Sequence, residues 1–328
     1  WHYYAGESGG MQGQDIACML RIFSGSSHPE LAAEIADYLG CPLCQTRTTR
    51  FSNDNPFVQL GESVRGKEVV LIQSFCPDVS DHILELLMML DAARSASAKT
   101  VHAIIPYFSY ARSDKKDQPR ISIAGRLIAD LLNTAGADHV MTMSLHSPQV
   151  HGFFPMPTDH LTAQAVFVRY FRSRDLHNVV VLAPDIGHAK RAAKFARALG
   201  IPVAAGDKER LSDASVAVAG IIGEVRGKNV IMFDDEIATG GSVLAMMHLL
   251  RRENVQKVIL VCTHGLFSGP AIERLKSIPE IEEVVTTNTV PIPLEKRLPN
   301  MTVLSVAPIF GEAIRRNMMG QSVGSLFA

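Results

Sequence analysis

Aromatic residues are scarce in this sequence of 328 residues: they make up 6%, and a single tryptophan is present. Hydrophobic residues nevertheless make up 47%. This balance suits parallel sheets of branched residues covered by Ala- and Leu-rich helices. The 32 basic and 33 acidic side chains nearly cancel, so the formal net charge is -1. A global basic field that would hold nucleic acid or an anionic membrane is therefore lacking, and local groups must bind any anionic ligand.

Long apolar stretches are also missing: no run of about 18 apolar residues occurs. This argues against a membrane span. Residues 1–10 have neither the basic start nor the apolar middle of a secretory signal. Met11 resembles a natural start, so we expect residues 1–10 to be an extension outside the fold. Five scattered cysteines, an odd and sparse set, argue against a disulfide framework and favour the reducing cytoplasm.

Two of the cysteines, in Cys41-Pro-Leu-Cys44, have a spacing that is typical of metal sites. No second Cys/Cys or Cys/His pair follows nearby, as a zinc site would need. We therefore expect two small buried side chains around a turn rather than a zinc or redox centre.

Apolar runs and helical patterns alternate along the chain. Strands are predicted at Leu20–Ser24, Glu68–Ser74, Val101–Pro106, His139–Ser144, Asn178–Ala183, Asn229–Phe233 and Lys257–Cys262. Helices are predicted at His28–Leu39, Val79–Ser95, Ser122–Thr134, Ala189–Leu199 and Ser242–Arg252. This alternation is typical of βαβ units, so the sequence predicts an α/β fold with mostly parallel central sheets flanked by helices.

A weak internal repeat divides this pattern into halves. Glu62–Lys67 (ESVRGK) resembles Glu224–Lys228 (EVRGK), and in both copies a glycine-containing turn opens an apolar strand. Chance similarity of two such turns is the alternative explanation. Two prolines near Pro155–Asp159 interrupt the pattern. We therefore expect similar domains over residues 11–157 and 158–306, with a final segment, 307–328, that packs back on the first domain.

The strongest local signal lies in residues 230–242, VIMFDDEIATGGS, where an apolar strand ends in two carboxylates and a Thr-Gly-Gly-Ser turn opens a helix. Small residues allow backbone N–H groups to approach a phosphate, and the helix N-terminus adds a favourable dipole. Carboxylates can accept hydrogen bonds from vicinal sugar hydroxyls. The segment predicts a sugar-phosphate site comprising Asp234, Asp235, Ala238, Thr239, Gly240, Gly241 and Ser242.

Two other interpretations of this segment are weaker. A Walker A loop would end in Gly-Lys-Ser/Thr, which is missing here. An ordinary loop with an N-capping serine is the plain structural alternative, and the complete unit of strand, carboxylate pair, loop and helix makes it the weaker one. The unit resembles the ribose-phosphate-binding loop of phosphoribosyltransferases and their relatives.

Further segments resemble one branch of that group, the ribose-phosphate pyrophosphokinases. Each is weak alone, but they occur in matching order from about residue 20 to the C-terminus. They comprise Phe51–Asn53, Gly61–Gly66, Ile105–Arg112 with Asp114–Asp117, Thr134–Asp138, Leu145-His146, Gly152–Phe154, Ala183–Asp185, Asp207–Arg210, and Thr263–Gly265 with Phe267–Pro270.

The resemblance implies two phosphoribosyltransferase-like domains in each chain and a hexameric homo-oligomer. It also implies transfer of the β,γ-diphosphoryl group of ATP to the anomeric hydroxyl of ribose 5-phosphate, which gives 5-phosphoribosyl 1-pyrophosphate and AMP. Mg²⁺ is the implied cofactor, with Mn²⁺ as an alternative. Mg²⁺ prefers few protein ligands together with phosphates and water, so a small number of protein ligands is enough. No nucleic acid or membrane partner is expected.

By the same resemblance, ATP binds to the first domain. Arg112 can pair with its phosphates in a forked geometry. Phe51 can stack on adenine, and Asn53 offers a donor and an acceptor to the base edge. Asp114 and Asp117 would orient neighbouring cations or accept hydrogen bonds from the nucleotide.

The implied metal ligands are His146 and Asp185, each of which follows a predicted strand. His146 matches the family's metal-binding histidine and would also contact ATP, although a lone histidine is more often structural. Asp185 precedes Gly187 and is placed for a cation or for sugar hydroxyls.

Lys208 and Arg210 lie in the polar stretch Gly206–Ala214, which composition alone would class as a solvated loop. The resemblance implies a mobile catalytic loop that closes on the transferring phosphates and excludes water. A regulatory site for inorganic phosphate and ADP is implied at the matching positions Ser63, Arg65, Arg120, Ser322 and Phe327.

Several positions depart from the family's pattern. A carboxylate near the metal is replaced by Ser144, and the loop carboxylate near the anomeric centre by Ala238. A common glutamate near adenine is Asn55, a common glutamine after Arg112 is Ser113, and a common glycine is His188. Two interpretations follow: a divergent active enzyme, or a catalytically weak or inactive homologue that binds nucleotide and regulates a true synthetase. A phosphoribosyltransferase acting on a base is a third, disfavoured by the doubled architecture.

Overall fold

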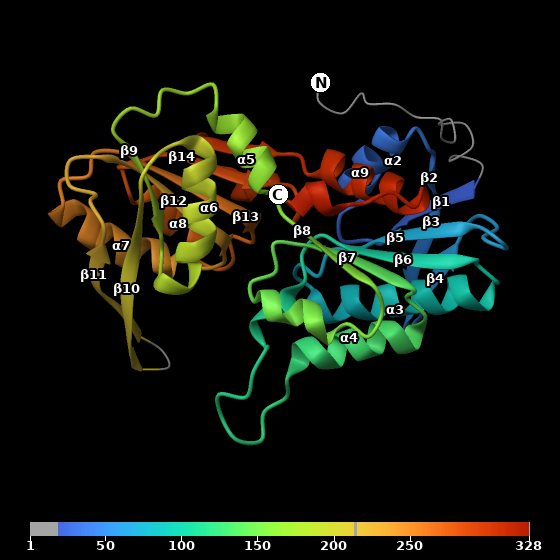
Figure 1. The fold of residues 1–328 in the computed structure, drawn as a ribbon. Helices are drawn as coiled ribbons and strands as arrows, with labels where there is room; N and C mark the ends of the chain where they lie inside the picture. The colour runs from blue at the N-terminus through green and yellow to red at the C-terminus, as the bar shows by residue number, and fades with distance from the viewer. Residues whose placement is uncertain (1–18, 213–214, 328) are drawn as a thin grey trace. The chain divides into compact units, whose positions relative to one another are not determined.

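The computed structural model describes residues 19–212 and 215–327. The chain divides into two units (Figure 1). Unit 1 comprises the chain up to Thr162 together with the segment from Val306 onward, and unit 2 spans Ala163–Ser305. Each unit has its own central sheet, so the predicted α/β class with mostly parallel sheets is confirmed. None of the helices in the described residues combines the length and the apolar character that crossing a membrane requires.

Unit 1 is built on a six-stranded sheet in the order β2-β1-β5-β6-β7-β8, in which all neighbours are parallel. Its strands are β1 (Leu20–Ser24), β2 (Leu43–Cys44), β5 (Glu68–Ile72), β6 (Thr100–Ile105), β7 (His139–Met143) and β8 (Thr158–Leu161). Figure 1 shows α3 (Val79–Ser95) and α4 (Ala124–Ala135) against one face, and α2 (Pro29–Leu39) and α9 (Ala307–Met318) against the other. A separate antiparallel hairpin joins β3 (Thr46–Arg50) to β4 (Pro56–Leu60).

Unit 2 contains a seven-stranded sheet in the order β11-β10-β9-β12-β13-β14-β15, parallel except for the edge hairpin of β10 and β11. The strands are β9 (Val179–Ala183), β10 (Val203–Ser212), β11 (Ser215–Ile222), β12 (Asn229–Ile237), β13 (Val258–Gly265), β14 (Ile281–Thr287) and β15 (Met301–Leu304). The helices are α5 (Gln164–Phe171), α6 (Ala189–Leu199), α7 (Gly241–Arg252) and α8 (Ala271–Lys276).

The two faces of the unit 2 sheet are packed differently. Under α7 and α8 the core is mostly aliphatic, with Met246 and Leu250 of α7 fully buried. On the face covered by α5 and α6, Phe195 stacks on Phe233 of β12 with 4.5 Å between ring centroids, and Phe167 meets Phe233 edge-on. In unit 2, aromatic contacts therefore fix α6 against β12, the strand that carries Asp234 and Asp235.

The internal repeat has the same local geometry in both copies. Gly66 and Gly227 adopt left-handed conformations, with φ of 68° and 65°. Their N–H groups donate to the carbonyl oxygens of Ser97 and Glu253, which follow α3 and α7 respectively. The turn before β5 in unit 1 and the turn before β12 in unit 2 are thus equivalent, each tying a strand to the end of the helix that follows it.

Most predicted elements are present within a few residues of their expected bounds, and two differences bear on the site. Strand β12 continues to Ile237, because Asp234 and Glu236 pair with Cys262 and His264 of β13. The stretch Gly206–Ala214 was expected to be a loop, but residues up to Ser212 form an arm of the β10–β11 hairpin. Charged residues are tolerated in such an edge hairpin, where one face stays open to water.

Cys41 and Cys44 are buried free thiols, as expected.

Candidate active site

The predicted sugar-phosphate segment forms a strand end, a short loop and a helix start. Asp234 and Asp235 lie near the end of β12, and α7 begins at Gly241. Gly240, which precedes the helix, has a φ of 71°, a conformation that favours glycine. Ser242 is exposed in the first turn of α7, and a helix N-terminus favours the binding of an anion.

The loop is supported from the side of α8. Arg274 Nη1 donates a hydrogen bond to the carbonyl oxygen of Thr239 at 2.9 Å, and the Ser268 N–H donates to the carbonyl oxygen of Ala238 at 2.8 Å. Both carbonyl groups are thereby engaged behind the loop. The exposed Thr239 side chain remains on the surface at the N-terminus of α7, which suits an anion-binding turn.

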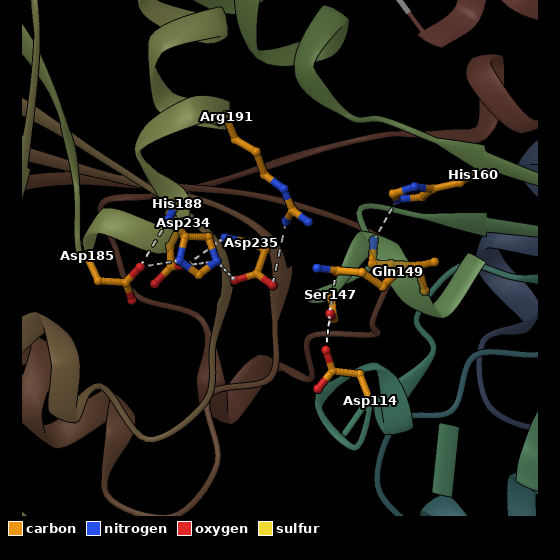
Figure 2. A network of polar contacts seen from close by, with 10 residues as sticks. Asp114, Ser147, Gln149, His160, Asp185, His188, Arg191, Asp234 and Asp235 are labelled. Atoms are coloured by element: carbon orange, nitrogen blue, oxygen red, sulfur yellow. Dashed lines mark hydrogen bonds and ion pairs between the residues drawn. The ribbon is translucent and has the colours of Figure 1, made fainter. Parts of the chain in front are cut away.

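His188 links the carboxylates at the ends of β9 and β12 (Figure 2). Its Nδ1 lies 2.8 Å from Asp185 Oδ1, and its Nε2 lies 3.1 Å from Asp235 Oδ1 and 3.7 Å from Asp234 Oδ1. Arg191 Nη1 lies 4.0 Å from the other oxygen of Asp235. The parallel pairing of β9 with β12 brings these groups together, although they are about 50 residues apart in the sequence.

The electrostatics of this cluster follow from burial and charge. Burial opposes the charge of His188, but hydrogen bonds to Asp185 and Asp235 and the nearby charge of Asp234 raise its pKa to about 10. Burial and the charge of Asp235 raise the pKa of Asp234 well above its ordinary value. The cluster therefore holds a persistent imidazolium among three carboxyl groups of which one resists ionisation.

The loops after β6 and β7 bring together several predicted residues of unit 1. Ser147, directly after His146, donates a hydrogen bond from its hydroxyl to Asp114 Oδ2 (Figure 2). His146 is half-buried, and Arg112 is exposed at the end of a short 3-10 helix, Ser109–Arg112. These polar groups lie at the carboxyl ends of parallel strands, where open α/β sheets bind ligands.

Phe51 and Asn53 lie in the turn of the β3–β4 hairpin. The turn is closed by backbone hydrogen bonds of 2.9 Å from Phe51 to Asn55 and from Asp54 to Phe51. Phe51 is 58% exposed, which is unusual for a large hydrophobic side chain, and it touches Phe57 edge-on. An exposed ring on a hairpin turn can stack on a planar ligand.

The backbone of Lys208 and Arg210 belongs to β10, paired with Val218 and Val216 of β11. Their side chains lie outside the described residues, and so does the hairpin turn at 213–214.

The predicted regulatory positions are distributed over unit 1. Ser63 and Arg65 are exposed and line one pocket of about 440 Å³ next to β4. Arg120 is exposed before α4, with a φ of 65°. Ser322 is exposed after α9, while the Phe327 side chain lies outside the described residues.

Asp117, predicted for ATP binding, is exposed in the loop before α4.

Two of the departures have structural roles. Ser113 Oγ accepts a hydrogen bond from the Ala124 N–H at 3.1 Å and donates to the Ser122 carbonyl oxygen at 3.3 Å, so it supports the start of α4. His188, which stands where the family commonly has glycine, joins the carboxylates that follow β9 and end β12. Arg191 was not predicted. Its spacing of three residues from His188, which directly precedes α6, was the available signal, because residues three apart at a helix start lie on the same side.

The donor groups fit a hard divalent ion on the side of Asp185. Its side chain is 28% exposed at the strand end, and carboxylate oxygens are the ligands that Mg²⁺ prefers. His146 offers an imidazole nitrogen, which suits softer metals better and would be a secondary ligand. Asp185 alone thus suits an ion that takes most of its ligands from phosphates and water.

Comparisons with known proteins identify the family of this chain. Residues 20–136 match the model of the N-terminal domain of ribose phosphate pyrophosphokinase, and residues 214–328 match a phosphoribosyl synthetase-associated domain. The chain is 51% identical to the ribose-phosphate pyrophosphokinase of Deinococcus radiodurans over 313 residues, covering 94% of this chain and 98% of that protein. It is 50% identical over 308 residues to a putative ribose-phosphate pyrophosphokinase of Streptomyces coelicolor, covering 94% and 97%.

A solved structure also matches nearly the whole chain. The phosphoribosylpyrophosphate synthetase of Mycobacterium smegmatis matches with a TM-score of 0.86 and 40% identity, over 92% of this chain and 99% of that one. The chain belongs to the ribose-phosphate pyrophosphokinase family.

Proposed function

We infer that this enzyme transfers the β,γ-diphosphoryl group of ATP to the anomeric hydroxyl of ribose 5-phosphate, with 5-phosphoribosyl 1-pyrophosphate and AMP as products. Family membership supports the reaction. The observation that carries the assignment of the sugar site is the Asp234–Asp235 pair near the end of β12, followed by the turn from Thr239 to Ser242 at the start of α7. Carboxylates and a helix N-terminus side by side suit a phosphorylated sugar.

The roles of the residues follow from charge and position. The turn Thr239–Ser242 binds the 5-phosphate through backbone N–H and hydroxyl groups, and Asp234 and Asp235 accept hydrogen bonds from the ribose hydroxyls. Asp185 and His146 are the candidate ligands of Mg²⁺, which would supply charge neutralisation for the transferring diphosphoryl group.

ATP-binding groups come from unit 1 in this proposal. Phe51 and Asn53 contact the base, Arg112 contacts phosphates, and Asp114 with Asp117 orients neighbouring cations. Asp114 accepts a hydrogen bond from Ser147 and is thus held in one orientation, which supports a positioning role. Lys208 and Arg210 would stabilise charge in the transition state from the β10–β11 hairpin, because phosphoryl transfer depends mainly on positioning and electrostatics.

We further propose that the enzyme is a hexameric homo-oligomer and that it is located in the cytoplasm. We also propose that inorganic phosphate and ADP regulate it at a site that includes Ser63 and Arg65. Free buried cysteines fit a reducing compartment. The exposed pocket that Ser63 and Arg65 line gives the regulators a location to test. Saturation curves for ribose 5-phosphate that ignore both ligands would contradict the regulatory part.

A second candidate function is a catalytically weak or inactive homologue that binds nucleotide and regulates a true synthetase. It is favoured by Ser144 and Ala238, which replace carboxylates that the family usually carries near the metal and the anomeric centre. Retention of the phosphate turn, His146 and Asp185 supports activity instead.

Product analysis decides between the two candidates. The purified full chain is incubated with ATP, Mg²⁺ and ribose 5-phosphate, and AMP and phosphoribosyl pyrophosphate are quantified. We expect both products in equal amounts, and AMP only when the sugar phosphate is present. If neither forms, even with Mn²⁺ and inorganic phosphate added, the enzymatic proposal fails and the regulatory one replaces it.

A further inference from the structure

Glu85 of α3 is a buried carboxyl group whose hydrogen bonds join three separate segments of unit 1. The residue is 3% exposed. Its oxygens accept from the Ser26 N–H at 3.1 Å and the Ser26 hydroxyl at 2.5 Å, from the Thr48 hydroxyl at 2.7 Å, and from Gln73 Nε2 at 2.6 Å. A carboxyl group is buried at low cost only where donors satisfy its oxygens, so these contacts hold Glu85 in one orientation.

Two of the three segments form a rigid platform. Ser26 follows β1 and Gln73 follows β5, and these strands are parallel neighbours, so both residues lie at the carboxyl edge of the sheet. Gln73 is fully buried, and its Oε1 accepts from the Ser27 N–H at 3.0 Å. A Cβ at Gly25 would lie 2.3 Å from this Oε1, which shows how closely the turn after β1 fits the amide. Glu85 is therefore fixed on the side of the sheet.

The third segment, the β3–β4 hairpin, is a separate two-stranded sheet, and such a hairpin is only marginally stable alone. Val58 and Leu60 of β4 pack against the core of unit 1. Strand β3 has four of its five residues exposed, so it depends on polar contacts instead. The bond from Thr48 to Glu85 ties the middle of this strand to the buried platform.

A second contact joins the hairpin to α3 one turn earlier. Arg50 Nη2 donates to Asp81 Oδ2 at 2.5 Å, and Arg50 Nη1 donates to the Asp54 carbonyl oxygen at 2.9 Å. The side chains of Arg50 and Asp81 are 42% and 53% exposed, so solvent screens this pair and its contribution is small. The bond to Glu85 is therefore the stronger polar attachment of β3.

We propose that Glu85 is a positioning residue for the nucleotide, because through Thr48 it fixes the hairpin whose turn carries Phe51 and Asn53. The inference rests on the proposed function, in which these two side chains contact the base. Thr48 precedes Phe51 by three positions in the same strand and turn, so a shift of β3 moves the ring. A hairpin that is fixed before ATP arrives loses less freedom on binding.

The first test measures ATP binding without turnover. The full chain is titrated with ATP and Mg²⁺ in a calorimeter, without sugar phosphate, for the wild type, Thr48→Val, Thr48→Ser and Thr49→Val. Thr48→Val keeps the branched shape without the hydroxyl, and Thr48→Ser keeps the hydroxyl. Thr49 is the matched control, because it is also exposed and neighbouring residues of a strand point to opposite faces.

We expect the Kd for ATP to rise about tenfold in Thr48→Val, since a hydrogen bond to a carboxylate is among the stronger ones. Thr48→Ser and Thr49→Val should bind ATP like the wild type. Hydrogen exchange of a peptide covering residues 46–60 should be about tenfold faster in Thr48→Val alone. Wild-type ATP affinity in Thr48→Val, or weaker binding with unchanged exchange of the hairpin, would overturn the proposal.

A double variant assigns the effect to Glu85. Glu85→Gln turns one acceptor oxygen into a donor and should also weaken ATP binding. Combined with Thr48→Val it should lose less than the product of the two single losses, because both changes remove the same contact. Independent, multiplicative losses would contradict a shared contact. Glu68→Gln is the control, since Glu68 contacts Lys99 and His102 instead of the hairpin. If Glu85→Gln does not fold, the Thr48 variants still decide.

The second test is kinetic. In Thr48→Val the KM for ATP should rise about tenfold, while kcat and the KM for ribose 5-phosphate stay constant, and Thr48→Ser should restore the wild-type value. A fall in kcat with both KM values unchanged would show that the contact has only a structural role. If the wild type forms no product at all, the proposed function fails, whereas the ATP titration and the exchange measurement still decide whether Glu85 positions the hairpin for the nucleotide.

Discussion

Two clusters of histidines and carboxylates, one in each unit, use the same kinds of side chain at opposite ends of parallel strands. In unit 1, His102 and His139 lie near the beginnings of β6 and β7. In unit 2, His188 follows the end of β9. We call them the unit 1 row (Glu68, His102, His139 and Asp159) and the unit 2 cluster (Asp185, His188, Asp234 and Asp235).

The unit 1 row is a continuous line of side-chain contacts across four neighbouring strands. His102 Nε2 lies 3.3 Å from Glu68 Oε2, the two Nδ1 atoms of His102 and His139 lie 3.3 Å apart, and His139 Nε2 lies 3.0 Å from Asp159 Oδ2. Lys99 adds an ion pair to Glu68 at 2.9 Å. Both histidine side chains are only 8% exposed, so the row is sealed from ligands and serves to join strands.

Location rather than residue type separates the two groups. At the carboxyl ends of parallel strands the connecting loops diverge and leave room for a ligand, whereas the interior of the sheet is closed by packing. The unit 2 cluster is next to the turn before α7, which we propose binds the 5-phosphate. We therefore expect changes in the unit 2 cluster to affect binding and changes in the unit 1 row to affect stability.

Neutralising one carboxylate in each group gives the largest contrast. Asp235→Asn should lower kcat/KM for ribose 5-phosphate by about 10³-fold, because the site loses a charged acceptor and His188 loses a partner. Asp159→Asn should leave the kinetics unchanged and lower the free energy of unfolding by about 1–3 kcal/mol. Steady-state kinetics and denaturant unfolding of both variants check this. Similar kinetic losses in both variants would break the comparison.

Two of the left-handed glycines of unit 2, Gly240 and Gly227, provide the next contrast. Gly240→Val should raise the KM for ribose 5-phosphate by about 10²-fold, since the branched side chain strains the turn that faces the phosphate. Gly227 has a similar φ of 65° and open space around it, but it lies in the turn that opens β12. Gly227→Val should therefore cost about 1–2 kcal/mol of stability with an unchanged KM. An unaltered KM in a folded Gly240→Val chain would refute the loop assignment.

The same contrast explains what the sequence could predict. The apolar strands were predictable because buried parallel strands have continuous apolar runs. Strand β12 appeared to end at Phe233 because three acidic residues follow, and its extension depends on pairing with β13. The β10–β11 hairpin was missed because its charged residues suggest a loop, while its order comes from antiparallel pairing at the sheet edge.

The candidate site divides in the same way. Residues 234–242 were predictable because strand end, turn and helix start are contiguous in the sequence. The contact of His188 with Asp235 was not, because it requires β9 and β12 to be neighbours in the sheet. Sequence could show that position 188 is unusual, but the function of its ring depends on a carboxylate from a distant strand.

Removing one imidazole sharpens the comparison within the unit 1 row. His102→Asn deletes the contacts of that ring with both Glu68 and His139, and leaves buried polar atoms without partners. We expect the free energy of unfolding to fall by about 2 kcal/mol, with KM values like those of the wild type. The double variant with Asp159→Asn should lose less than the sum of the single losses, because the residues belong to one network. Additive losses would mean that the row does not act as a unit.

The smallest expected effect is a pH dependence of stability that comes from Glu68. The hydrogen bond to His102 is the main cause that lowers the pKa of Glu68 from 4.5 to about 2, with Lys99 and Thr100 adding to it against the opposing effect of burial. Because the pKa is lower in the folded state, the ionised carboxylate stabilises the fold above pH 4.5, and this contribution is lost as the pH falls from about 4.5 to 2. Unfolding of the wild type and Glu68→Gln, followed by circular dichroism between pH 2 and 6, isolates the effect. The difference in stability between the two chains should shrink across this range, whereas a constant difference would show that the charge of Glu68 contributes nothing and that the row is held by neutral hydrogen bonds.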